Sequence, residues 1–242
     1  MTSIRVGTWN VEYATGVSRN ERRLVRIQAE VADIWVLTET HDDLDLSPTH
    51  SPVSTVQRPA GRPGGRWATI WSRWPIVERV VVGDPVRTVA AVVEGPRGPL
   101  LVYGTVMPWG SDPGPDLANP ARGWTEQHRV LPLQVAEWQD LQRRYPEVTL
   151  VVAGDLNMNL GGKHYYGTAR GRATLQAGLD RAGLACAMEW ERVPEGTLRH
   201  PPIDHVLVPE AWIAGSRVVS AWEGTTPDGV RLSDHSGLVI SV

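Results

Sequence analysis

The sequence predicts a mixed α/β protein in which helices pack outside a system of mixed β-sheets. Two observations support this fold class. Short apolar runs, which are typical of buried strands, recur along the whole chain and outnumber the amphipathic segments that favour helices. Some of these runs are separated only by short turns, which indicates a mixed sheet system with helices outside it. The 242 residues contain no internal repeat and no low-complexity linker, so we expect one domain spanning residues 1–242.

The apolar runs define the expected strands, which are Ile4–Val11, Ile34–Thr38, Trp67–Ser72, Val77–Val82, Thr88–Glu94, Leu100–Val106, Thr149–Ala153, Ile203–Val208 and Gly237–Val242. Apolar residues at helical spacing predict helices over Asn20–Asp33, Thr125–Arg144 and Arg172–Gly183. Asn20 and Thr125 are expected as N-caps because their side chains can accept hydrogen bonds from the first turn. Gly183 is expected as a C-cap because it adopts a left-handed conformation without strain.

The composition restricts the partners and the compartment. A net charge of -3 provides no global basic field for nucleic acid, so a polyanion would have to be held by a local patch. Cys186 is the only cysteine, which excludes an intramolecular disulfide and suits a reducing compartment. The N-terminal residues show no signal-peptide pattern, and no apolar run approaches the roughly 20 residues that span a bilayer. We expect a soluble, cytoplasmic monomer.

Polar residues suited to metal binding and acid–base chemistry recur at the ends of the expected strands. They are Asn10, Glu39, Asp155, Asn157, Asp204, Asp234 and His235. In open α/β systems the strand ends converge on one rim, where ligand sites form. Four carboxylates, two amides and a histidine on one rim would be electrostatically costly without a cation. Oxygen ligands of this kind favour a hard divalent ion, Mg²⁺ or Mn²⁺.

These residues stand in six short motifs that span the chain. The motifs are Thr8-Trp9-Asn10-Val11, Leu37-Thr38-Glu39-Thr40, Ser72-Arg73-Trp74-Pro75-Ile76, Gly154-Asp155-Leu156-Asn157, Ile203-Asp204-His205 and Ser233-Asp234-His235-Ser236. In kind and order they resemble the endonuclease/exonuclease/phosphatase superfamily, which includes deoxyribonuclease I-like enzymes, apurinic/apyrimidinic endonucleases, inositol polyphosphate 5-phosphatases and neutral sphingomyelinases. The resemblance implies a four-layer α/β sandwich, with two packed mixed β-sheets flanked by helices.

The resemblance also implies roles for individual residues. Glu39 would be the principal Mg²⁺ ligand, with Asn10 and Asp234 near the metal. Asp155 would align or deprotonate the attacking water, and Asn157 would hold a phosphoryl oxygen. His235, oriented by Asp204, would contact the phosphate or act as a base. The chemistry would be in-line attack of water on phosphorus, with the anionic charge neutralised by the metal and by amide and imidazolium donors.

One departure from the family pattern concerns the proton donor for the leaving group. The family usually places a His or Tyr on the strand before the mid-chain loop, close to a Pro. Here the matching position is Thr105 or Val106, and neither can serve as a general acid. Tyr103 would face the same side as Thr105, but about 6–7 Å along the strand. Either another residue protonates the leaving oxygen, or the metal carries it alone.

The segments beside these motifs suggest substrate contacts. Lys163, His164, Tyr165, Arg170 and Arg172 closely follow Asn157 and form a basic, aromatic segment that we expect to bind substrate.

Two long loops, Arg58–Arg66 and Pro108–Gly123, are of a kind that is often functional. Arg58, Arg62 and Arg66 could grip phosphates, with Trp67 stacking on a base, or could belong to a solvated loop. We take the solvated loop as the expectation.

The sequence thus predicts a metal-dependent hydrolase of phosphate esters, with a nuclease-like phosphodiesterase as the leading subclass and nucleic acid as a candidate substrate. Two alternatives stay open. A phosphomonoesterase, or a phosphatase of lipid headgroups or inositol phosphates, could use the same scaffold. A binding module that retains the fold without catalysis is the alternative from another class, and the intact set of polar residues argues against it.

Overall fold

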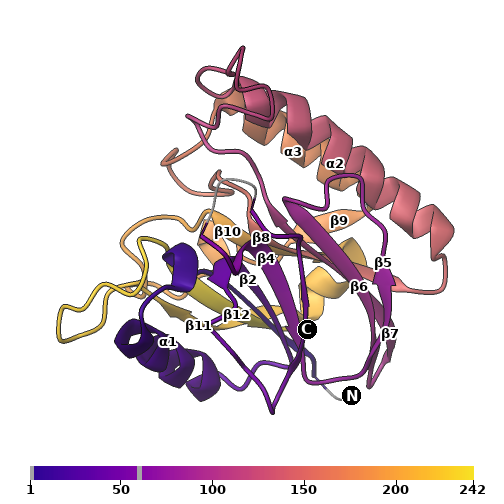
Figure 1. Ribbon diagram of the computed structural model, residues 1–242. Coiled ribbons are helices and arrows are strands. Elements are labelled where there is room, and N and C mark those ends of the chain that lie inside the picture. The colour runs from indigo at the N-terminus through magenta and orange to yellow at the C-terminus, as the bar shows by residue number, and fades with distance from the viewer. Residues whose placement is uncertain (1–2, 59–61) are drawn as a thin grey trace.

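The computed structural model describes residues 3–58 and 62–242. The first two residues of the chain and residues 59–61 of the expected loop Arg58–Arg66 lie outside the described residues. The described chain forms two six-stranded sheets with helices on their outer faces (Figure 1). The predicted four-layer α/β sandwich is therefore confirmed. None of the helices in the described part of the chain is long and apolar enough to cross a membrane.

The first sheet combines strands from both ends of the chain. Its strands in spatial order are β11 (Arg217–Trp222), β12 (Gly237–Ser241), β1 (Arg5–Asn10), β2 (Ile34–His41), β4 (Gly65–Ser72) and β3 (Ser51–Ser54). β1 and β2 are parallel, whereas the other neighbours are antiparallel. As a result, β1 and β2 both end at the same rim of the sheet.

The second sheet contains the middle of the chain. Its strands in spatial order are β5 (Ile76–Val80), β6 (Thr88–Gly95), β7 (Gly98–Val106), β8 (Thr149–Asp155), β10 (Asp204–Pro209) and β9 (Leu184–Cys186). β7 and β8 are parallel, and β10 runs antiparallel to β8 with Asp204 opposite Asp155. The end of β8 and the start of β10 therefore share one rim.

The core consists of two apolar clusters, which hold the sheets and helices together as layers. Side chains such as Val36 and Ile70 of the first sheet pack with Leu101 and Val152 of the second in a cluster that also includes Leu131 of α2 (Thr125–Arg144) and Leu175 of α3 (Ala169–Ala182). A separate cluster, which includes Ile27, Trp9 and Trp35, joins α1 (Val17–Ala29) to the outer face of the first sheet. Burial of this surface, at about 25 cal/mol per Å² of apolar area, holds the four layers together.

The predicted helices form, but two of the three predicted caps are wrong. Asn20 lies inside α1, which begins at Val17 after Gly16, and its buried amide donates to the Ala14 carbonyl oxygen at 2.6 Å. A tertiary hydrogen bond therefore replaces the expected cap. Thr125 is the first residue of α2 rather than its N-cap, because its hydroxyl donates to the Arg122 carbonyl oxygen at 2.7 Å. Gly183 is the C-cap of α3 with φ of 61°, as predicted.

The strands absent from the prediction lie at sheet edges. They are β3, β9 and β11, and each occupies the end of its sheet. β3 contains a proline and β9 has only three residues, so neither has the continuous apolar run of a central strand. The three short 3-10 helices, Glu12–Ala14, Trp190–Arg192 and Glu210–Gly215, were likewise not expected.

Candidate active site

The expected site residues meet where the two sheets present strand ends to the same side. Asn10 ends β1, Asp155 ends β8, and Glu39 lies near the end of β2. The Asn10 amide donates to a carboxylate oxygen of Glu39 and to one of Asp155, both at 3.2 Å. Asn10 and Glu39 belong to the first sheet and Asp155 to the second. The amide therefore ties the two sheets together at the site.

Asp155 is held by the turn that follows it. The Asn157 backbone N–H donates to Oδ1 of Asp155 at 2.8 Å, and the Asn157 side-chain amide donates to Oδ2 at 3.1 Å and to the Met107 carbonyl oxygen at 2.9 Å. Asn157 itself has φ of 51°, which asparagine tolerates better than most residues. Burial raises the pKa of the Asp155 carboxyl to about 7, with the nearby Asp204 adding to the rise.

His235 forms a close pair with Asp204. Its Nδ1 lies 2.6 Å from Oδ2 of Asp204, and its Nε2 lies 4.0 Å from Oδ2 of Asp155. Burial disfavours the imidazolium, but the charges of Asp204 and Asp155 outweigh it and raise the pKa of His235 to about 10. The ring is therefore protonated at neutral pH, with Nδ1–H donating to Asp204 and Nε2–H directed toward Asp155.

Hydrogen bonds to the backbone fix the segment that carries His235. The Ser233 hydroxyl donates to the Asn10 carbonyl oxygen at 2.6 Å and accepts the His235 backbone N–H at 3.0 Å. The Trp9 indole N–H donates to the His235 carbonyl oxygen at 3.1 Å. The imidazole is thus positioned from β1 as well as from the segment before β12. Short polar motifs do not disclose such supporting bonds, so Ser233 and Trp9 were not singled out from the sequence.

The donor set suits a hard divalent cation. One side-chain atom from each of Asp155, Asp204 and His235 lies within 4.8 Å of the others, and because the His235 ring is protonated, only the two carboxylates of this group could bind a cation. Burial also raises the pKa of Glu39, so a nearby cation would stabilise its ionised form. Within the described residues, Oδ1 of Asp204 is buried and has no hydrogen-bond partner. Carboxylate and amide oxygens predominate in this cluster, which fits the ligand preference of Mg²⁺ or Mn²⁺.

Asp234 and the expected substrate-binding residues lie farther out. The Asp234 side chain is 54% exposed and lies 3.6 Å from the Arg231 guanidinium. In the part of the chain that the structure describes, no hydrogen bond or ion pair joins Lys163, His164, Tyr165, Arg170 or Arg172 to the seven central residues.

The segment that holds these five residues nevertheless packs against the turn that follows Asp155, because the Asn159 backbone N–H donates to the Tyr166 carbonyl oxygen at 3.4 Å. The hydroxyl of Tyr166 has a raised pKa, because of burial and then of the Asp155 charge. Tyr165 stacks on His200 with ring centroids 4.5 Å apart.

The strand that should supply a proton donor directs its polar groups away from the site. Thr105 donates to the Gln134 side chain at 2.9 Å, and the Tyr103 hydroxyl donates to Glu137 at 2.5 Å. Both partners belong to α2, which packs on the outer face of the second sheet. The remaining candidate position, Val106, is buried and apolar. None of these three residues can protonate a leaving group at the site.

The fold and the arrangement of Asp155, His235 and Asp204 beside Asn10 and Glu39 define a hydrolase of phosphate esters. Comparison with known families agrees with this class. The chain belongs to the Endonuclease/Exonuclease/phosphatase family, whose sequence profile matches residues 7–235. Among curated protein sequences, no relative matches at a significant level.

Solved structures with the same fold come from enzymes of different specificity. An AP endonuclease from Archaeoglobus fulgidus has a TM-score of 0.68 and 17% identity, covering 99% of this chain and 98% of that chain. A 3'-5' exonuclease from Neisseria meningitidis has a TM-score of 0.67 and 19% identity, covering 98% of each chain. A mannosyl-6-phosphatase from Bacteroides thetaiotaomicron has a TM-score of 0.66 and 15% identity, covering 99% of each chain. At these identities the likeness establishes the fold.

Proposed function

We propose that the protein is a Mg²⁺-dependent phosphodiesterase of the nuclease type, in which water attacks phosphorus in line with the leaving oxygen. The observation that carries the proposal is the meeting of Asp155, His235 and Asp204 within hydrogen-bonding and ion-pairing distance, beside the Asn10–Glu39 contact. A buried carboxylate, a buried imidazolium and further oxygen donors at one rim are suited to water activation and to neutralising a phosphoryl group.

Each residue has a task in this proposal. The Asp155 carboxylate, whose pKa lies near neutrality, accepts a proton from the attacking water, while Asn157 and Asn10 hold it in place. The His235 imidazolium donates its Nε2 proton as a hydrogen bond to a phosphoryl oxygen, and Asp204 keeps the ring charged and oriented. Glu39, Asn10 and Asp234 would hold the divalent ion, which when bound supplies positive charge against the phosphate.

The nuclease subclass and the monoesterase alternative share this site. Nuclease action is favoured because the neighbouring cavity offers arginine and aromatic side chains in addition to the phosphate site. The monoesterase stays the second candidate because one matched structure is a mannosyl-6-phosphatase. A comparison of bis-p-nitrophenyl phosphate with p-nitrophenyl phosphate separates the two, since only the former is a diester.

The proposal is tested by measuring hydrolysis of bis-p-nitrophenyl phosphate with Mg²⁺, with Mn²⁺ and with EDTA. We expect turnover with either ion and its loss in EDTA. Asp155→Asn should lower kcat by at least about a hundredfold, as expected for removal of a general base. Asp180→Asn, in the exposed part of α3, is the matched control and should retain the wild-type rate. Metal-independent turnover, or full activity of Asp155→Asn, would refute the mechanism.

The proposal assigns substrate binding to Lys163, His164, Tyr165, Arg170 and Arg172. Their exposed or half-buried side chains follow the catalytic turn and precede or begin α3, so they can face a polyanion that extends from the site. Changing Arg170 and Arg172 together to Ala should raise KM more than it lowers kcat. An unchanged KM would place this segment outside the substrate path. The proposal retains a cytoplasmic monomer, which is compatible with the single buried cysteine.

A further inference from the structure

A strained turn follows the catalytic strand β1. Three consecutive residues other than glycine, Glu12, Tyr13 and Ala14, have positive φ values of 47°, 65° and 39°. Each such residue costs roughly 1–3 kcal/mol and persists only where the surroundings enforce it. Here the Glu12 N–H donates to the Asn10 side chain at 2.9 Å, and Asn20 holds the Ala14 carbonyl oxygen at 2.6 Å. Backbone strain of this kind is concentrated at functional sites.

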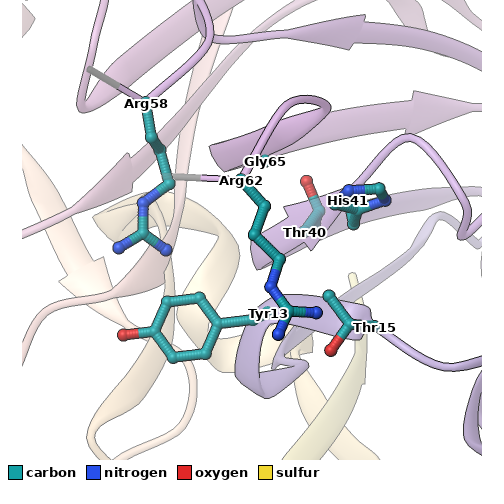
Figure 2. A pocket seen from close by; sticks show the side chains of 7 residues that line it. All are labelled: Tyr13, Thr15, Thr40, His41, Arg58, Arg62 and Gly65. Atoms are coloured by element: carbon teal, nitrogen blue, oxygen red, sulfur yellow. The ribbon is translucent and has the colours of Figure 1, made fainter. Parts of the chain in front are cut away.

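The consequence of the turn is the position of Tyr13. The residue stays 48% exposed, and its side chain lines a cavity together with Arg58, Arg62 and Thr40 (Figure 2). A salt bridge between Glu12 and Arg231, at 2.7 Å, also holds the turn. Because this conformation is locked by three separate contacts, the Tyr13 ring is presented in a defined orientation.

Arg58 joins Tyr13 to a second aromatic ring. Its guanidinium lies 4.5 Å from the centre of the Tyr13 ring and 3.6 Å from the centre of the Trp67 ring. Arg58 is half-buried, so the expectation of a solvated loop is wrong for this residue. Its positive charge also opposes the burial-induced rise in the pKa of Glu39. Thr40, which follows Glu39 in β2, lines the same cavity as Arg58 and so connects this cavity to the proposed site. An arginine held between rings loses little side-chain entropy when it binds an anion.

The cavity beside these residues has a volume of about 300 Å³. Figure 2 shows the Arg58 and Arg62 side chains extending toward Tyr13, with Thr15 and Thr40 on the cavity wall. Two guanidinium groups, the Thr15 hydroxyl group and an exposed aromatic ring offer both charge for a phosphate and a flat surface for a planar ring. Local positive charge of this kind is needed because the whole chain carries a net charge of -3.

We propose that this cavity is a subsite for the nucleotide next to the scissile phosphate of a single-stranded nucleic acid, with Arg58 and Arg62 on its phosphate and the Tyr13 ring against its base. The subsite rests on the proposed function, because it assumes that the neighbouring site holds the scissile phosphate. A single strand fits because its bases are free to stack on aromatic side chains, whereas those of a duplex are already stacked. Inositol phosphates and phospholipid headgroups have no planar ring to stack.

The test measures binding separately from hydrolysis. A fluorescein-labelled single-stranded oligonucleotide of 12 nucleotides is titrated with the full-length protein in a buffer that contains Ca²⁺. Binding is followed by fluorescence anisotropy at several salt concentrations. Arg58→Gln should weaken binding at least about tenfold and lower the slope of log K against log salt concentration by about 0.7, the value for one phosphate contact in a single strand. Tyr13→Ala should weaken binding roughly tenfold, as loss of one base–aromatic stack does, and leave the slope unchanged.

The chain offers a matched control for the arginine–tryptophan stack. Arg97 lies 4.9 Å from the Trp212 ring, just before β7 and at the opposite end of that strand from the site. Arg97→Gln should bind the single strand as the wild type does. Arg58→Lys keeps the charge without the planar stack and should retain the wild-type salt slope at reduced affinity. Thermal unfolding of every variant verifies that the fold is retained.

The outcomes separate the subsite from the proposed function. Wild-type affinity in Arg58→Gln would overturn the subsite, even if the wild type hydrolyses phosphodiesters. Equal losses for a single strand and for a duplex would also overturn it, because base stacking requires unpaired bases. If the wild type hydrolyses no phosphodiester with Mg²⁺, yet single-strand binding falls selectively in Arg58→Gln and Tyr13→Ala, the proposed catalysis fails and the single-strand site is supported.

Discussion

Acid should destabilise the protein through one buried histidine. His205 is fully buried on β10, where its Nε2–H donates to the Met158 carbonyl oxygen at 2.9 Å and its Nδ1 lies 3.4 Å from the Cys186 sulfur. Burial lowers the pKa of His205 to about 4, although Asp204 partly opposes this change. In the unfolded chain the same group titrates near its ordinary pKa of about 6.5. The unfolded state therefore takes up a proton first as the pH falls.

The size of the effect follows from these two pKa values. The stabilisation from keeping His205 neutral is complete above about pH 6.5 and is lost as the pH falls toward 4. At 1.36 kcal/mol per pKa unit, the full loss is roughly 3 kcal/mol, and the loss between pH 7.5 and pH 5 is about 2 kcal/mol. Asp155 and other groups also titrate in this range, so a comparison with a variant that lacks only the histidine isolates the effect.

The assay is urea unfolding of the wild type and His205→Gln at pH 7.5, 6.5, 5.5 and 5. The glutamine amide can still donate to the Met158 carbonyl oxygen but does not titrate. We expect the difference in unfolding free energy between the two proteins to shift by about 2 kcal/mol in favour of the variant between pH 7.5 and pH 5. Exposed His164→Gln is the control and should follow the wild type. A difference that is independent of pH would refute the reasoning.

Three further predictions concern packing and reactivity. Gly154→Ala should destabilise the protein by at least about 3 kcal/mol in thermal unfolding, because the residue has φ of 133° and an added Cβ would lie 2.0 Å from the Thr105 carbonyl oxygen. Gly215→Ala is the control, since an added Cβ there meets open space. A cost of Gly154→Ala no larger than that of Gly215→Ala would contradict this reasoning. Arg23→Leu should lower the free energy of unfolding in urea by about 3 kcal/mol, because the fully buried guanidinium donates two hydrogen bonds to the Leu232 carbonyl oxygen. If the variant is as stable as the wild type, those hydrogen bonds are dispensable. The Cys186 thiol, whose pKa is raised to about 12 by burial, should react with a disulfide reagent at pH 8 only after unfolding, so rapid labelling of the native protein would argue against its burial.

The predictability of the fold follows from where the apolar residues lie. Central strands such as β8 are buried on both faces and appear as continuous apolar runs, so their positions were evident. Edge strands such as β3 and β11 have mixed exposure and no such run. The start of α1 was misplaced because Asn20 makes a tertiary bond to Ala14 that a local capping rule does not consider.

Some residues of the candidate site could be predicted from the sequence, and others could not. Asn10, Glu39 and Asp155 were predictable because strand ends in a sheet system converge on one rim. Tyr13 was not, because its position depends on three successive left-handed residues, for which the sequence contains neither glycine nor another turn signal at those positions. The contact of Arg58 with Tyr13 joins segments that are distant in the chain, which only the folded structure brings together.

The hydrogen bonds from the Asn10 amide to Glu39 and Asp155 also have a consequence for the partly folded chain. The first sheet draws its strands from residues 5–72 and 217–241, and the second from residues 76–209, so the site lacks half of its groups until the two have docked. A nascent or partly unfolded chain would therefore have no hydrolytic activity. Hydrolysis of a phosphate ester could begin only once the two sheets have docked.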